Sequence, residues 1–328
     1  MAANAKLKEL VQRCRQSASY FIENFCKIKH PSLGIIPVKL FKYQKSSIKH
    51  FRTHRLNLFK KCRQSGISTL AGLYALWVGM FFGYKKILIT SKRDLDAKNF
   101  LNENVKLPYS HLPEWMREIW GNPIDNEHEL GFSNGSIVRS LTSGPDTLRS
   151  NAASLNIIDE AAFTPDMEAM WAGGWPTLQH GGGCICISTP SGLGNWYWDK
   201  WTDAQAPGSL FNPILINWWD MDWVLEKYDQ ITNSTIRIAP IDGLRKCESK
   251  EDIEKWGPYW SPWLDNQYKA LKAKGEAHLF KQEILGEFIG GGGTILSHSV
   301  LIHTEKSIKT APDAETIAKP IQWVSQAN

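Results

Sequence analysis

Two carboxylates stand side by side at the end of an apolar run in the stretch SLNIIDEAAF. Leu155 to Ile158 read as a buried strand, which would deliver Asp159 and Glu160 at its carboxyl end. In phosphoryl transfer, an acidic residue placed there can hold Mg²⁺, and the next carboxylate can polarise an attacking water. The structural alternative is that the two acids only cap the following helix through its dipole.

A second stretch, KKCRQSGISTLAG at residues 60–72, follows the phosphate-loop pattern G-x-x-x-x-G-K-[ST] with one exception. Gly66 and Ser68 fall in register, whereas Ile67 stands at the lysine position and Lys61 at the first glycine. Backbone N–H groups at the start of a helix hold phosphates without a lysine. Because such a loop curls round the phosphates, its ends lie close together. We therefore expect the four-carbon stem of Lys61 to carry its ammonium group into the place of the missing lysine cation.

If these two stretches form a nucleotide site, other residues become candidates for it. In FKYQ, residues 41–44, an aromatic ring can stack on adenine and Gln44 can pair with its N6 and N7 edge, although an ordinary helix start also explains the pattern. Arg149 precedes the acidic pair by ten residues and could stabilise charge at a γ-phosphate, or form a surface ion pair. The small hydroxyls of STPSG, residues 188–192, could sense that phosphate or simply form a turn. Arg63 is the rival of Lys61 as the loop cation.

Charge is distributed unevenly along the 328 residues, whose net charge is +5. From Asn24 to Arg93 there are fifteen Lys and Arg and no Asp or Glu, against 23 basic and 33 acidic residues elsewhere. This asymmetry favours an anionic partner, either a nucleotide, a nucleic acid or both, over a merely solvated basic face. The longest apolar run, Leu73 to Tyr84, is too short to span a bilayer, so no membrane partner is expected. The six scattered cysteines indicate reduced, buried thiols.

The elements that must position these residues alternate along the chain. Strands are predicted over residues 55–62, 85–91, 136–144, 155–158 and 182–192, and helices over residues 43–54, 68–82 and 94–108. Alternation of this kind predicts βαβ units, a mostly parallel sheet and the α/β class. Beyond about Pro207 the rhythm stops, and short helices rich in Trp, Pro and Gly are expected.

The motifs in this order resemble the ATPase part of the terminase large subunit of tailed bacteriophages, closest to the myovirus type. The resemblance runs from YFIENFCKIKH through CRQSGIST, PDTLRSNAASLNIIDEAAF and STPSGLGNWYWDKW to KQEILGEFIGGGGTILS, nearly the whole chain. It implies a P-loop NTPase fold with an additional strand and a catalytic glutamate, plus a small, mainly helical subdomain. The expected divisions are a helical segment of that subdomain at 1–38, the ATPase core at 39–206, the rest of the subdomain at 207–290 and a linker at 291–328.

The resemblance also implies roles for single residues. Tyr43 and Gln44 would contact adenine, and Ser188, Thr189 and Pro190 would couple hydrolysis to movement. Ser68 and Asp159 would bind Mg²⁺, Glu160 would activate water, and Arg63 or Arg149 would be the arginine finger. The loop that would cradle the phosphates of ATP consists of Lys61, Cys62, Arg63, Gln64, Ser65, Gly66, Ile67, Ser68 and Thr69. Ile67 departs from most members of the family, some of which carry the lysine at the start of the loop.

By the same resemblance, the activity is ATP hydrolysis that drives double-stranded DNA into a prohead in the cytoplasm of the host cell. The partners would be DNA, the portal and prohead, the small terminase subunit and further copies of the chain in a pentameric ring. The family's nuclease domain would begin about where this sequence stops, so no nuclease residues are assigned. Two other functions remain open: a helicase-like DNA-dependent ATPase, and a nucleotide- or DNA-binding scaffold without hydrolysis, which Ile67 favours and Glu160 disfavours.

Overall fold

An eight-stranded sheet carries the motifs identified in the sequence. The computed structural model describes residues 2–30, 33–149, 151–179, 181–222, 225–229 and 234–290. The expected linker at 291–328 lies outside these residues. The strands of the sheet are, in spatial order, β10 (Asn212–Ile216), β3 (Leu56–Lys61), β9 (Gly183–Ser188), β8 (Leu155–Asp159), β4 (Lys86–Ser91), β7 (Ile137–Thr142), β6 (Glu129–Gly131) and β5 (Ile124–Asn126). From β10 to β7 all pairs are parallel, and β6 and β5 add an antiparallel edge.

The order of the central strands decides where the motifs meet. β9 lies between β3, which leads into the phosphate loop, and β8, which ends in the acidic pair. Lys60 is opposite Ser188, and Asp159 is opposite Ile187, so the three strands end at the same edge of the sheet. β9, inserted between the strand of the phosphate loop and the strand of the acidic pair, is the additional strand. The predicted α/β class, the mostly parallel sheet and the additional strand are therefore confirmed.

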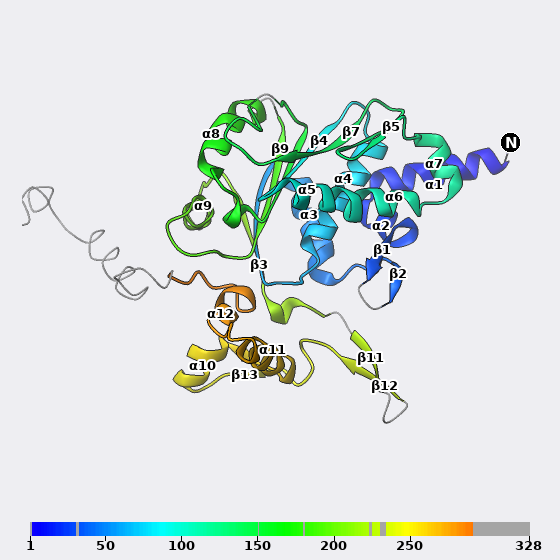
Figure 1. Cartoon of the computed structure of the whole chain (residues 1–328). Coiled ribbons are helices and arrows are strands. Elements are labelled where there is room, and N and C mark those ends of the chain that lie inside the picture. Colours follow the sequence, from blue (N-terminus) through cyan, green and yellow to red (C-terminus); the bar gives the residue numbers. More distant parts are fainter. Residues whose placement is uncertain are drawn as a thin grey trace, which may run out of the picture. The chain divides into compact units, whose positions relative to one another are not determined.

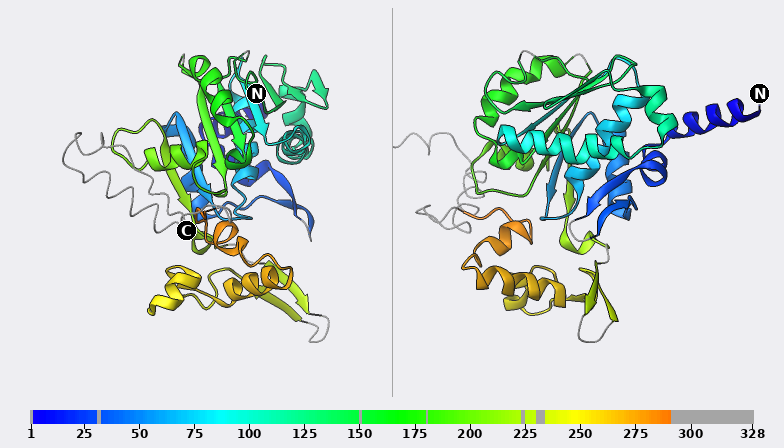
Figure 2. Two further views of the ribbon diagram at one scale, coloured as in Figure 1. Left: turned by 60° about the vertical axis from the view of Figure 1, so that its left-hand side comes forward. Right: turned by 45° about the vertical axis from the view of Figure 1, so that its right-hand side comes forward.

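Helices cover both faces of this sheet (Figures 1 and 2). One apolar core contains buried residues of α2, α3 and α4, and a second contains those of α8 and α9. The helices are α1 (Ala2–Gln16), α2 (Ala18–Phe25), α3 (Lys42–Thr53), α4 (Ile67–Phe81), α5 (Asp94–Leu101), α6 (Leu107–Ser110), α7 (Glu114–Trp120), α8 (Met167–Leu178), α9 (Trp196–Asp203), α10 (Lys250–Trp256), α11 (Pro262–Ala273) and α12 (Leu279–Glu283). A π-helical turn, Asn102–Lys106, joins α5 to α6 within the helix predicted at 94–108.

Three small hairpins complete the described part of the chain. They pair β1 (Lys27–His30) with β2 (Gly34–Pro37), β11 (Leu225–Asp229) with β12 (Ser234–Ile238), and β13 (Arg245–Lys246) with β14 (Tyr259–Trp260). The sequence analysis predicted none of these hairpins, nor β10. None of the helices that the structure describes has the length and apolar character needed to cross a bilayer.

The first two helices pack along α4. The indole nitrogen of Trp77 donates a hydrogen bond of 2.8 Å to the carbonyl of Cys14, and the rings of Phe21 and Phe81 lie 5.1 Å apart. The described residues up to Phe288 form one compact unit. The divisions expected at residues 38 and 206 stay predictions.

Candidate active site

The phosphate loop is shaped by two residues with left-handed backbone conformation. Gln64 has a φ of 61°, and Gly66, the N-cap residue directly before α4, has a φ of 69°. A side chain at Gly66 would be strained at this φ, and its Cβ would lie 3.1 Å from Nε2 of Gln44. Glycine is therefore required here both by the backbone and by the close approach of α3.

Residues at the start of α3 contact the phosphate loop and hold it in position. The hydroxyl of Tyr43 donates a hydrogen bond of 2.7 Å to the carbonyl of Ser65, and its ring stacks on Phe41 at 5.9 Å. Oε1 of Gln44 accepts a 3.1 Å hydrogen bond from the N–H of Phe41. Because Tyr43 and Gln44 are both only 9% exposed, they hold the loop in place; their predicted contact with adenine is untested.

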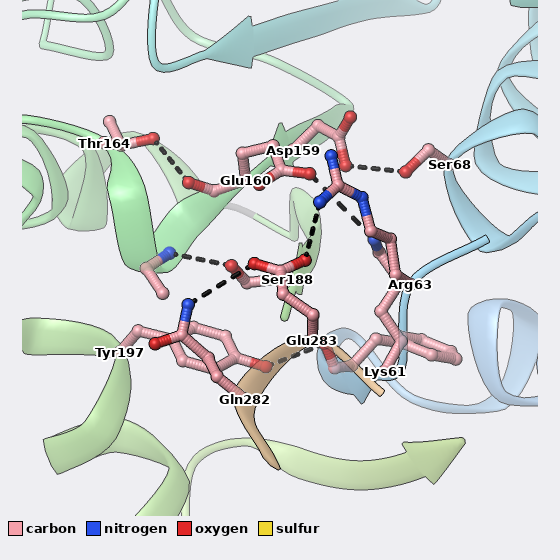
Figure 3. Close-up of polar contacts among 12 residues, drawn as sticks. Lys61, Arg63, Ser68, Asp159, Glu160, Thr164, Ser188, Tyr197, Gln282 and Glu283 are labelled. Atoms are coloured by element: carbon pink, nitrogen blue, oxygen red, sulfur yellow. Dashed lines mark hydrogen bonds and ion pairs between the residues drawn. The ribbon is translucent and has the colours of Figure 1, made fainter. Parts of the chain in front are cut away.

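The acidic pair meets the loop through Ser68. Its hydroxyl donates a hydrogen bond of 2.7 Å to Oδ1 of Asp159, which joins the first turn of α4 to the end of β8 (Figure 3). Burial raises the pKa of Asp159, and the nearby Lys61 ammonium opposes that shift. A carboxylate and a hydroxyl so placed are a typical protein share of a Mg²⁺ site that nucleotide phosphates complete.

Glu160 follows in a strained conformation. Its φ of 56° and ψ of 39° are rare for a residue with a side chain, and such strain costs on the order of 1–3 kcal/mol. Thr164 stabilises the turn by donating a 3.1 Å hydrogen bond to the Glu160 carbonyl. Strain of this kind is concentrated at functional sites, which supports an active role for the carboxylate.

Ile67, at the position of the usual loop lysine, and Lys61, at the start of the loop, have different surroundings. Ile67 is fully buried within the core that α4 shares with α3. The Lys61 side chain is 9% exposed, and its Nζ lies 3.9 Å from Oε1 of Glu160. The cation therefore reaches the edge of the sheet where the acidic pair ends; its contact with phosphates stays a prediction.

The two candidate arginines are both turned to other carboxylates. Arg63 is exposed, and its Nη1 lies 3.2 Å from Oε2 of Glu283, whose carbonyl also accepts a 2.8 Å hydrogen bond from the Arg63 N–H. Arg149 is exposed and pairs with Asp146 at 2.9 Å. In the described part of the chain, neither arginine forms an ion pair with Asp159 or Glu160. Their role as fingers is therefore a prediction.

The end of β9 is tied to the acidic turn. The hydroxyl of Ser188 accepts a 3.1 Å hydrogen bond from the N–H of Ala162, two residues after Glu160. Ser188, Thr189 and Pro190 are all buried. This contact is a direct connection through which the predicted coupling residues could respond to the site.

A buried polar atom in the loop lacks a partner. The hydroxyl of Ser65 has less than 1 Å² exposed and no hydrogen-bond partner among the residues that the structure describes. Leaving such a group unpaired is costly, and a phosphate oxygen would satisfy it. No cluster of three or more His, Cys, Asp or Glu suited to a metal occurs in the described ranges. The residues present thus fit Mg²⁺ bound together with a nucleotide, rather than a metal held by protein alone.

Two contacts, one of the loop and one of the strand that leads into it, were not predicted from sequence. Besides Glu283, they involve Lys60, whose ammonium donates a 3.0 Å hydrogen bond to the carbonyl of Gly286 and lies over the rings of Trp201 and Phe288 at 5.1 and 5.3 Å. Burial lowers the pKa of Lys60. Both contacts join residues more than 200 positions apart, a separation at which no local sequence pattern signals pairing.

Comparison with known proteins identifies the fold. No family model matches the chain. The ATPase domain of the Thermus phage P74-26 large terminase superimposes with a TM-score of 0.50 at 19% identity, covering 76% of this chain and 94% of that one. The large terminase of bacteriophage HK97 superimposes with a TM-score of 0.56 at 16% identity, covering 84% of this chain and 55% of that one. The resemblance to large terminase ATPase domains is thus confirmed as a likeness of fold.

Proposed function

We propose that this chain is an ATPase that drives double-stranded DNA into a viral prohead, the ATPase part of a terminase large subunit. The observation that carries the proposal is the bond between Ser68 and Asp159, formed at the sheet edge where the phosphate loop begins. Glu160 and Lys61 lie at the same edge. Together they supply the metal ligands, the base and the cation that ATP hydrolysis requires.

Each residue has a distinct role in the proposed reaction. The backbone N–H groups of residues 64–68 would hold the phosphates at the start of α4. Ser68 and Asp159 would hold Mg²⁺, which balances the phosphate charge when bound. Glu160 would take a proton from water as the water oxygen bonds to the γ-phosphorus and the bond to the bridging oxygen breaks. ADP and phosphate are the products.

Lys61 would stay beside Glu160 until a nucleotide binds. Its ammonium, 3.9 Å from the carboxylate, would then turn to the phosphates, which frees Glu160 to accept a proton. Arg149, whose one ion pair among the described residues is with the exposed Asp146, would reach the site of a neighbouring copy. DNA, the prohead and the small subunit as partners, and the host cytoplasm as location, belong to the same proposal.

The test is ATP turnover by the purified chain with Mg²⁺, with and without duplex DNA. We expect hydrolysis that requires Mg²⁺ and Glu160. A chain that binds no nucleotide would refute the proposal. A chain that binds ATP but does not turn it over, even with DNA and proheads present, would instead be the nucleotide- or DNA-binding scaffold considered above.

A further inference from the structure

The basic stretch singled out in the sequence is only partly explained by the phosphate loop. Much of it lies on α3, where cationic side chains follow one another at intervals of three and four residues. All four are exposed, and they form the α3 stripe: Lys42, Lys45, Lys49 and Arg52. At 1.5 Å per residue, the stripe extends over about 15 Å. Arg55 continues it beyond the end of the helix.

Few of these charges are neutralised within the chain. Lys45 pairs with Glu23 at 2.9 Å, whereas Lys42, Lys49, Arg52 and Arg55 have no ion pair with any residue in the described ranges. The side chain of Arg52 is positioned instead by a 3.2 Å hydrogen bond to the carbonyl of Gln16. Cations that have no ion pair, in a row interrupted only by the neutralised Lys45, form a favourable surface for a polyanion.

The end of the stripe stands between two hollows. Thr53, His54 and Arg55 line both a hollow of about 620 Å³, which extends to Asn212, and one of about 380 Å³, which extends to Lys85. No ion pair within the described residues engages Lys85. The turn after α3, Thr53–Arg55, therefore borders a hollow on each side and is called the ridge below; a charged backbone can follow it on either side.

We infer that the α3 stripe and the ridge at Thr53–Arg55 contact the phosphate backbone of duplex DNA. The Tyr and Phe residues of α3, Tyr43 and Phe51, are buried, and the rings of His50 and His54 stack on each other at 5.6 Å, so the stripe presents cations rather than a platform of Phe, Tyr or Trp rings for unpaired bases. Cations without stacking rings bind the sugar-phosphate backbone irrespective of sequence. The identity of the partner rests on the proposed function; the surface itself does not.

The opposite face of the same helix holds the phosphate loop. Tyr43 bonds to Ser65, and the amide of Gln44 lies against Gly66, so α3 touches the loop at one end and presents cations along its exposed face. DNA bound to the stripe would restrain the helix that shapes the loop. The inferred contact should therefore affect both DNA affinity and the DNA-stimulated part of ATP turnover.

The experiment uses the double variant Lys49→Glu/Arg55→Glu, because neither side chain has a hydrogen bond or ion pair in the described structure. The matched control is Lys272→Glu/Lys274→Glu, which makes the same charge change at exposed residues of α11 and its end. Binding of a fluorescein-labelled duplex is followed by anisotropy over a range of salt concentrations. ATP turnover is measured with and without DNA.

For the stripe variant we expect weaker binding to every DNA sequence and a salt dependence reduced by about 2 in slope, since two phosphate contacts are lost. DNA-stimulated turnover should fall, while basal turnover and thermal stability stay unchanged. Equal DNA binding by the stripe variant and the control, or no duplex binding by the unmodified chain, would overturn the inference. If the charge-reversed protein does not fold, Lys42→Ala/Lys49→Ala should give the same reduction in slope. Absent ATP turnover would count against the proposed function alone, because the binding slopes are measured without ATP.

Discussion

The Lys61 ammonium and the Glu160 carboxylate lie 3.9 Å apart, although Lys61 ends β3, Glu160 follows β8, and these two strands are not neighbours in the sheet. β9 separates the two strands. The pair places a cation that is almost buried beside a carboxylate on a strained turn. Two of the four predictions below separate what these side chains do.

Replacing Glu160 by Gln removes the carboxylate and keeps the shape of the side chain. ATP binding should be retained, while turnover should fall by at least about 100-fold, because the amide cannot take a proton from water. The measurement is steady-state phosphate release alongside nucleotide affinity. Glu168→Gln, at an exposed site on α8, is the matched control. Turnover at the unmodified rate would show that Glu160 is not the base.

Lys61→Ala should be more damaging to nucleotide binding than Lys60→Ala. A charge-assisted contact to phosphate is worth about 1.5–3 kcal/mol, which corresponds to a loss of about 10- to 100-fold in ATP affinity. Lys60→Ala should keep that affinity but lower the free energy of unfolding by about 1 kcal/mol, since Gly286 loses its partner. Calorimetric titration and chemical denaturation measure the two effects. Normal ATP affinity of Lys61→Ala would assign the phosphate cation to Arg63 or to a partner subunit.

Arg149→Ala should reduce turnover on the order of 10³- to 10⁵-fold without loss of ATP binding, as expected of an arginine finger. Its exposure and its single exposed partner, Asp146, favour action on a neighbouring copy. Mixing Arg149→Ala with Glu160→Gln protein should then restore part of the turnover. Unchanged turnover of Arg149→Ala under packaging conditions would exclude it from the site.

Glu283→Gln should release Arg63. The ion pair has one exposed partner and is worth about 0.2–1 kcal/mol, so ATP affinity should rise by no more than about fivefold if Arg63 turns to the γ-phosphate. The double variant Arg63→Ala/Glu283→Gln is the control and should show no gain over Arg63→Ala. Equal ATP affinity of Glu283→Gln and the unmodified chain would mean that Arg63 does not reach the nucleotide.

Sequence patterns were sufficient to predict a site residue where the strand or helix and its motif are continuous in the chain. The apolar run of β8 predicted where Asp159 emerges, and the register of Gly66 and Ser68 predicted the loop that meets it. β10 was missed because NPILI begins with Asn-Pro and is short, features of a turn. The partner of Arg63 was missed for a different reason: Glu283 is 220 residues away, and only tertiary packing brings it near.

Lys60 and Lys61 are adjacent in β3, and successive side chains of a strand point to opposite faces. A slip of one residue in the pairing of β3 could move Lys61 into the place of Lys60, under the rings of Trp201 and Phe288. β3 is held in register by β9 and β10, whose residues follow it by more than 120 positions. During synthesis, β3 therefore leaves the ribosome long before either strand that fixes its alignment. The position of Lys61 at the phosphate loop therefore depends on strands that are synthesised well after it.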